Sequence, residues 1–291
     1  MPENRLPITK TYKLAIGGNL PRSESGRSLP VHAADGSLVA HACRASRKDL
    51  RAAVEAARKA LPGWSGSTAY LRGQILYRMG EMMEGKRDEL ARSISAVDGR
   101  SHEDALEEVD AAIDRVVCMA GWTDKHQQVL GCANPVAGPY HNFTIPEPVG
   151  VVGTMVRSDC PLLGPISVIA PALATANTVV TLADETNPLP GCILGEVIGT
   201  SDIPPGVVNI LTGLDEELAP HFAEHAGIDA VVAAGLEPDH ARTLRLGVAG
   251  NLKRVAIWND CGHFDDPERF EGPDALEPFI EYKTMWHPAS S

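Results

Sequence analysis

Two cysteines stand where a thiol could act as a nucleophile. Cys160 lies between a short apolar run and a helical segment, and a helix N-terminus lowers the pKa of a nearby thiol. Cys261 and His263 lie close together and could form a nucleophilic pair, or bind a metal ion together with Asp265 and Asp266. We expect the plainer alternatives, which are a packed thiol at Cys160 and a solvated acidic loop around Cys261.

Two further groups of polar residues match patterns that can carry chemistry. His221-Phe-Ala-Glu-His225 fits the H-x-x-E-H pattern of some zinc peptidases, but no third ligand accompanies it, so we expect no metal site. Asp184 and Glu185 could form an acid/base pair, but adjacent residues of a strand point to opposite faces. We therefore expect Asp184 to cap a helix and Glu185 to accept hydrogen bonds from a ligand.

These residues lie on a regular alternation of strands and helices. Five apolar runs predict buried strands, at 149–156, 178–182, 207–211, 230–233 and 254–258. Four helical segments separate them, at 161–175, 189–198, 216–225 and 239–248. The alternation predicts an α/β fold with a five-stranded parallel Rossmann-like sheet flanked by helices, joined by right-handed crossovers.

The N-terminal part is expected to be mainly helical. Three short strand candidates come first, at 12–17, 29–32 and 37–42. A helix then begins after Ser46, a typical N-cap residue, and is expected to stop at Pro62. Further helices are predicted at 71–83, 86–97 and 101–122.

The composition limits the classes of function. In a chain of 291 residues, 44% hydrophobic residues are enough for a packed core. A net charge of -12 disfavours nucleic acid and anionic membranes as partners, because both attract basic surfaces. No apolar run approaches the roughly 18 residues that cross a bilayer, and the six cysteines lack metal-site spacing. We expect a cytoplasmic protein with reduced thiols.

Short motifs in a fixed order make the chain resemble the aldehyde dehydrogenase superfamily over nearly its whole length. The motifs are Leu61-Pro-Gly-Trp64, Ala120-Gly-Trp122, Glu147-Pro-Val-Gly-Val-Val-Gly153, Ile169-Ala-Pro-Ala-Leu-Ala174, Asn177-Thr-Val-Val180, Pro205-Gly-Val-Val-Asn209 and Asn251-Leu-Lys-Arg-Val255. Each is weak alone, but their order and spacing together are specific to that superfamily.

The resemblance implies a crevice for NAD(P), but with altered contacts. Glu185 would accept from the adenosine ribose, and Gly213 and Gly235 would lie in the loops around the cofactor. The lysine that accompanies such a glutamate in the family is Leu182 here. The serine at the start of the helix that faces the pyrophosphate is Leu236.

The family's catalytic groups have no counterparts in this sequence. The asparagine that holds the oxyanion corresponds to Asp159, which cannot donate when ionised. The general-base glutamate corresponds to Trp258, which cannot take a proton. Nothing matches the domain that carries the nucleophilic cysteine. The chain therefore resembles a truncated member without catalytic residues.

The resemblance divides the chain into three parts. Residues 10–125 and 147–260 correspond to a discontinuous cofactor-binding-like domain, and 261–274 to a linker that replaces the catalytic domain. Residues 126–146 and 275–288 correspond to a small antiparallel oligomerisation arm. The residues expected at an interface are Phe143, Ile145, Phe279, Ile280, Tyr282, Met285 and Trp286.

An arm that is kept without the catalytic domain predicts a protein partner. In the family this arm packs on a neighbouring subunit. We expect a catalytically inactive structural or regulatory subunit that assembles with a full-length aldehyde dehydrogenase or with itself. The alternatives are a module that binds NAD(P) or another adenine nucleotide, and an NAD(P)-dependent oxidoreductase that acts on aldehydes.

Overall fold

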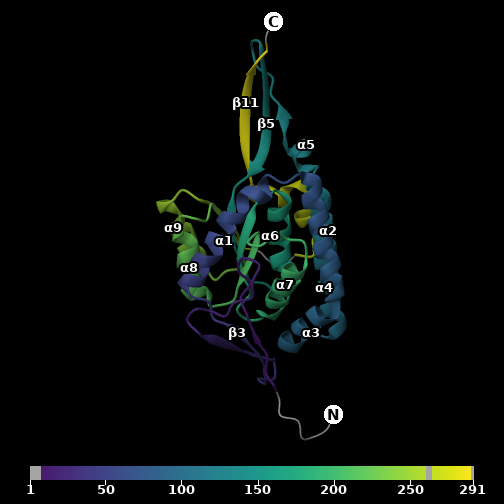
Figure 1. Cartoon of the computed structure of the whole chain (residues 1–291), viewed down its shortest axis with the longest axis vertical. Coiled ribbons are helices and arrows are strands. Elements are labelled where there is room, and N and C mark those ends of the chain that lie inside the picture. Colours follow the sequence, from purple (N-terminus) through teal and green to yellow (C-terminus); the bar gives the residue numbers. More distant parts are fainter. Residues whose placement is uncertain (1–7, 260–263, 290–291) are drawn as a thin grey trace.

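A parallel sheet of five strands forms the centre of the chain. The computed structural model describes residues 8–259 and 264–289. The sheet strands are β6 (Val151–Val156), β7 (Thr178–Leu182), β8 (Val208–Leu211), β9 (Ala230–Ala234) and β10 (Arg254–Trp258). They pair in the order β10-β9-β6-β7-β8, with every neighbouring pair parallel. The predicted fold class is confirmed (Figure 1).

Helices cover both faces of this sheet. α6 (Leu163–Ala174) and α7 (Leu189–Thr200) lie on one face, whereas α8 (Asp215–Glu224) and α9 (Pro238–Gly247) lie on the other (Figure 1). β6 and β7 are buried along their whole length, as expected for apolar runs that are covered on both sides. Because the chain proceeds outward from β6 to β8 and then crosses back to β9, the strand order reverses beside β6.

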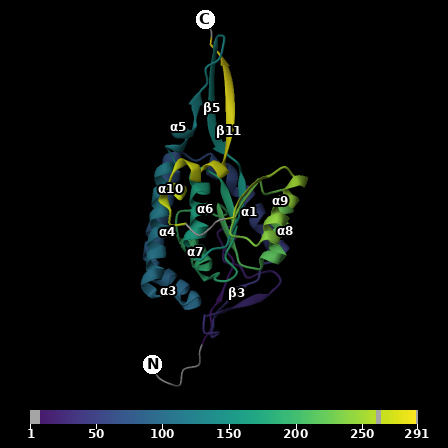
Figure 2. The same ribbon diagram turned by 180° about the vertical axis from the view of Figure 1, so that it is seen from behind.

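The N-terminal helices add a second layer. α1 (Arg47–Ser65) packs with α8 over one face of the sheet. α2 (Ala69–Gly85), α3 (Arg87–Asp98) and α4 (His102–Trp122) pack on the outside of α6 and α7, as Figure 2 shows from behind. Within the described ranges, no helix is both long and apolar enough to cross a membrane.

α1 begins as predicted but ends later. The Ser46 hydroxyl accepts from the N–H of Asp49, whose carboxylate accepts in return from the N–H of Ser46. The expected stop at Pro62 is wrong, since the helix continues to Ser65. Pro62 removes one hydrogen bond from the last turn, but the burial of Trp64 beyond it in the core keeps this turn helical.

A small sheet precedes these helices. It contains β1 (Thr11–Tyr12), β2 (Ser28–His32) and β3 (Leu38–Cys43), in the order β1-β3-β2. β1 is shorter than the predicted strand. After Tyr12 the chain turns away from β3 and pairs instead with β8, an edge strand of the main sheet. The N–H of Ala15 donates to the carbonyl of Ile210 at 2.9 Å.

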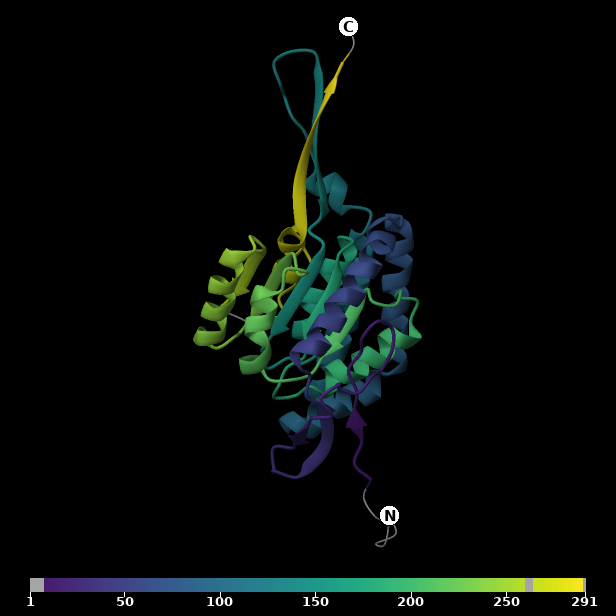
Figure 3. The same ribbon diagram turned by 60° about the vertical axis from the view of Figure 1, so that its left-hand side comes forward.

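A narrow antiparallel ribbon projects from the domain (Figure 3). β5 (Tyr140–Pro148) and β11 (Ile280–Pro288) pair residue for residue along their whole length. β4 (Cys132–Ala133) adds a short third strand beside β5, and α5 (His126–Leu130) lies just before it in the chain. The predicted small antiparallel sheet is confirmed, and we call these three strands the arm.

The chain between the sheet and the arm is packed rather than solvated where the structure describes it. Segment 264–279 contains α10 (Pro267–Phe270), and the side chains of Phe264 and Phe270 are each 2% exposed. Their rings lie 4.9 Å apart in the same core cluster as α6. The expected solvated acidic loop is therefore wrong from Phe264 onward, because apolar side chains anchor this segment to the domain.

Candidate functional site

The carboxyl ends of β6, β7 and β8 meet at one edge of the sheet, where α/β folds bind ligands. Arg157 follows β6, and its Nε lies 2.6 Å from Oδ2 of Asp215, the first residue of α8. A second bond joins Nη2 to Oδ1. Nη1 donates to the carbonyls of Val156 at 2.7 Å and Leu182 at 3.4 Å. One side chain thus ties the end of β6 to the end of β7 and to the start of α8.

Glu185 lies beside this ion pair and also connects the loop after β7 to the start of α8. Its Oε2 accepts from the backbone N–H of Asp215 at 2.9 Å. α8 has no capping side chain from its own N-cap residue, so Glu185 caps it from the loop after β7, where the helix dipole favours negative charge. Glu185 was expected to contact a ribose, but one of its two carboxylate oxygens is already hydrogen-bonded within the fold.

Asp184 is separated from its neighbour. It is buried, and its Oδ1 accepts from the N–H of Thr186 at 2.8 Å and from the Thr186 hydroxyl at 2.6 Å. Glu185 is exposed. The two carboxylates do not form an acid/base pair, and Asp184 holds a turn rather than the helix cap that we expected.

The two candidate glycines have structural reasons to be glycine. A Cβ on Gly213 would lie 2.9 Å from Cδ1 of Leu218, which is too close. Gly235 has a φ of +64°, and its N–H donates to the carbonyl of Trp258 at 3.1 Å. Both positions are explained by packing and turn geometry without a ligand.

α9 is the helix that was expected to face a pyrophosphate, but the residues at its N-terminus do not favour binding of an anion. Glu237 is the N-cap residue of α9 and makes no capping bond, and Asp239 lies in the first turn. Between them, Pro238 has no N–H to donate. Leu236, in place of a serine, packs against the core. The residues present do not fit a dinucleotide in the way that the resemblance implies.

Cys160 is poorly suited to nucleophilic attack. Burial raises the pKa of its thiol to about 12, and the nearby carboxylate of Glu108 acts in the same direction. The N–H groups of Leu162 and Leu163, at the start of α6, donate to Oε1 of Glu108 at 2.8 and 3.1 Å. The helix terminus that could have lowered the thiol pKa is thus already paired with a carboxylate.

Trp258 has a packing role at the position that corresponds to the general base. Its ring meets the ring of Phe270 edge to face, with 5.8 Å between centroids. The guanidinium of Arg269 lies 5.8 Å from the indole centroid. The indole therefore connects β10 to segment 264–279.

The described residues contain no group of three or more side chains that could hold a metal ion. His225 follows the end of α8, and its Nδ1 accepts from the N–H of Gly227 at 3.0 Å. Burial lowers the pKa of His225. Cys261 and His263 lie outside the described residues.

The residues that were expected at an interface differ in how much of their side chain is exposed. Phe279 and Ile280 are 0% and 1% exposed, so they belong to the core of this chain, contrary to our expectation. They are buried because segment 264–279 packs into the domain before β11 leaves it. Tyr282 and Trp286 lie farther along β11 and are 51% and 61% exposed.

The remaining interface residues lie within the arm. Phe143, Ile145 and Met285 are partly buried. Trp286 packs edge to face against Tyr140 across the ribbon, with ring centroids 5.8 Å apart. Tyr140 was not expected as a partner of Trp286, although the alternation of β5 is the signal that could have shown it.

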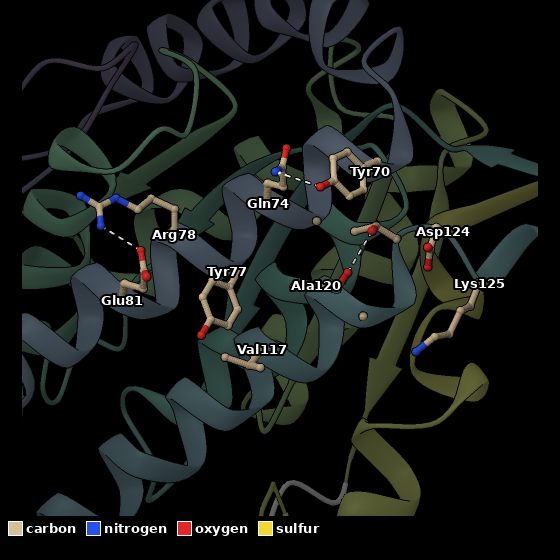
Figure 4. A pocket seen from close by; sticks show the side chains of 12 residues that line it. Tyr70, Gln74, Tyr77, Arg78, Glu81, Val117, Ala120, Asp124 and Lys125 are labelled. Carbon is tan, nitrogen blue, oxygen red and sulfur yellow. Dashed lines mark hydrogen bonds and ion pairs between the residues drawn. The ribbon is translucent and has the colours of Figure 1, made fainter.

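A hollow of ≈ 680 Å³ lies apart from the sheet edge, between α2 and α4 (Figure 4). Tyr70 and Tyr77 line it and are 72% and 53% exposed. Arg78 and Glu81 form an ion pair of 2.8 Å at its border. Sequence analysis did not identify this hollow, although two tyrosines seven residues apart on one helix were visible.

Comparison with known protein families gives a match over most of the chain. The model of the "Aldehyde dehydrogenase family" matches residues 22–257. Retinal dehydrogenase 2 of Gallus gallus is 35% identical over 261 residues, which are 88% of this chain and 50% of that protein. Mitochondrial benzaldehyde dehydrogenase of Antirrhinum majus is 30% identical, over 86% of this chain and 47% of that protein.

Solved structures give the same result. The NAD+ complex of aldehyde dehydrogenase from Bacillus cereus is similar with a TM-score of 0.80 and 28% identity, over 85% of this chain and 50% of that chain. PnpE from Pseudomonas sp. WBC-3 in complex with nicotinamide adenine dinucleotide has the same TM-score and identity. The chain spans about half the length of the relatives that it matches.

Proposed function

Because the chain belongs to the aldehyde dehydrogenase family, we propose that it is a catalytically inactive subunit that assembles with a full-length member of that family. The loss of catalytic groups supports inactivity. Asp159 and Trp258 stand where the family has the oxyanion donor and the general base, and the thiol of Cys160 has a pKa raised to about 12. Acyl transfer through a thioester needs a thiolate and a base, which these residues do not supply.

The arm is the observation that carries the proposal of a partner. The outer edge of β11 has no strand partner among the described residues, so its backbone N–H and C=O groups face outward. Tyr282 and Trp286 expose large rings along the same strand. A narrow ribbon of this kind is only marginally stable in water. Addition of this edge to a partner's sheet would satisfy the backbone groups and cover the aromatic rings.

A full-length homologue supports this role better than a second copy of the chain. The family's arm docks on a neighbouring subunit's catalytic domain, and the relatives are about twice as long as this chain. A second copy would bring another arm without the surface on which the arm docks. Self-assembly is therefore the weaker form of the proposal.

Co-expression with an affinity-tagged full-length aldehyde dehydrogenase from the same genome tests assembly. We expect the chain to co-purify at a fixed ratio, and Trp286→Asp to reduce the captured amount at least tenfold. Leu38→Asp is the matched control, because Leu38 is 45% exposed on β3, which lies at the opposite end of the molecule from the arm (Figure 1). A chain that stays monomeric and uncaptured, or equal capture of both variants, would contradict the proposal.

A nucleotide-binding module is the alternative function. It is favoured by the two similar structures that contain NAD+ or nicotinamide adenine dinucleotide. One oxygen of Glu185 is also left free of the contact with Asp215. Calorimetric titration of the chain alone distinguishes this function from assembly, because it requires no partner.

A further inference from the structure

We propose that this chain closes its own nucleotide crevice, with the Arg157–Asp215 ion pair in the place that a dinucleotide would take. The family implies NAD(P) at the carboxyl edge of the sheet. The contacts of this chain at that edge are instead internal. The proposal concerns the chain alone, and it holds with or without a protein partner.

The position of the ion pair is the first reason. Arg157 reaches from the end of β6 past the end of β7, where it touches the Leu182 carbonyl, to the first residue of α8. A ligand that lies along these strand ends would have to displace the guanidinium. The two side chains are only 11% and 5% exposed, so the pair is part of the domain interior.

The contacts around the pair leave few groups for a ligand. The guanidinium donates to two carboxylate oxygens and two carbonyl oxygens. The first N–H of α8 donates to Glu185. Helix N–H groups and cations are what α/β folds offer to phosphates, and here the first N–H of α8 and the guanidinium of Arg157 are already paired.

The charge at the rim is the second, independent reason. Glu185, Glu216, Glu237 and Asp239 lie in the loop after β7 and in the N-terminal regions of α8 and α9. The nearby cation Arg44 is paired with Glu217, with Nε 3.1 Å from Oε2. A pyrophosphate would therefore meet carboxylates whose charge is not balanced by a free cation among these residues. Such an arrangement repels a dinucleotide.

Titration of the purified wild-type chain with NAD, NADH and NADP, up to millimolar concentrations, tests the proposal. We expect no saturable heat in calorimetry and no rise in the melting temperature. Saturable binding of any of the three, with a matching rise in melting temperature, would overturn it. Assembly with a partner does not enter this measurement, so the two proposals fail separately.

A paired variant tests whether this ion pair is the cause. Arg157→Met combined with Asp215→Gly removes both charges and opens the space, and Arg78→Met removes one charge of the exposed pair with Glu81. We expect saturable NADH binding by the double variant at concentrations where the wild type and the control show none. A folded double variant without this binding would show that the pair does not close the crevice. If that variant does not fold, the wild-type titration still decides the proposal.

Discussion

Individual residues that resemble parts of a ligand site contribute here to packing and helix termini. Glu185 caps α8, Trp258 packs edge to face against Phe270, and Arg157 bridges strand ends. Lys253 also supports a helix terminus, since its Nζ donates to the carbonyls of Phe222 and His225 at 3.0 and 2.8 Å. It thereby satisfies carbonyls at the C-terminal end of α8, where a cation suits the helix dipole.

Lys253 gives a prediction for the pH dependence of stability. Burial lowers the pKa of its ammonium from 10.5 to about 8. Below about pH 8 the group is charged in both the folded and the unfolded state. Between pH 8 and 10.5 the unfolded state binds more protons, so the free energy of unfolding of the wild type should rise with pH relative to Lys253→Met.

Urea unfolding of both proteins at several pH values between 7 and 10.5 measures this difference. The comparison with the variant cancels the other groups that titrate in the same range. A difference in unfolding free energy that stays constant, or that falls as the pH rises, would show that the ammonium is not destabilised by burial.

At the scale of elements, segment 264–279 was expected to be a connector, but it packs as part of the domain. Arg115 on α4 donates from Nη2 to the Phe264 carbonyl at 2.9 Å and from Nη1 to the Ser167 hydroxyl at 2.7 Å. Trp122 donates from Nε1 to the carbonyl of Glu271 at 2.7 Å. The segment thus covers α4 and α6 on the side where the chain passes from the sheet to the arm.

The packing of Phe270 can be tested by truncation. Phe270→Ala should lower the free energy of unfolding by about 3–5 kcal/mol, because a buried aromatic ring is lost and a cavity remains. Tyr282→Ala on the exposed side of β11 is the control, with an expected change of about 0.5 kcal/mol or less. Chemical denaturation of the isolated chain measures both. Equal, small effects would show that the segment is a loose linker.

At the scale of the whole molecule, the chain combines an α/β domain with an arm that extends beyond it (Figures 1 and 3). The relatives that it matches are about twice as long. Fold alone does not determine function, so the proposed inactivity rests on the residues at positions 160 and 258, which are Cys160 and Trp258. The arm is the part that the proposed partner would contact.

The isolated chain should not oxidise aldehydes. With NAD or NADP and a panel of aliphatic and aromatic aldehydes, we expect no NADH or NADPH formation above the rate without protein. The reason is the absence of a positioned thiolate and base at Cys160 and Trp258. A full-length family member serves as the positive control in the same spectrophotometric assay. Aldehyde-dependent turnover that is abolished by Cys160→Ala would refute the prediction.

Much of the fold was predictable because local patterns dictate it. β7 and β10 match the predicted runs residue for residue, since each apolar run is bounded by polar or turn residues. The limits of α1 were less predictable, because the burial of Trp64 keeps the helix intact past Pro62. The packing of Phe264 was not predictable, because an acidic, proline-containing segment gives no local sign that its few aromatic residues are buried.

The sequence named candidate site residues but did not show how they are arranged. The sequence pointed to Glu185 and Gly235 and to the changes at Leu182 and Leu236. It did not show that Glu185 would cap α8, because the partner is a backbone N–H 30 residues away.

The sequence by itself determined the family and the parallel sheet, because these follow from local composition and motif order. Only the tertiary structure decided what the remaining residues do. Arg157 and Asp215 are 58 residues apart and meet only when the ends of β6, β7 and β8 lie side by side. Phe279 and Trp286 are only seven residues apart in the sequence. Phe279 is buried and Trp286 is exposed, because β11 leaves the domain between them.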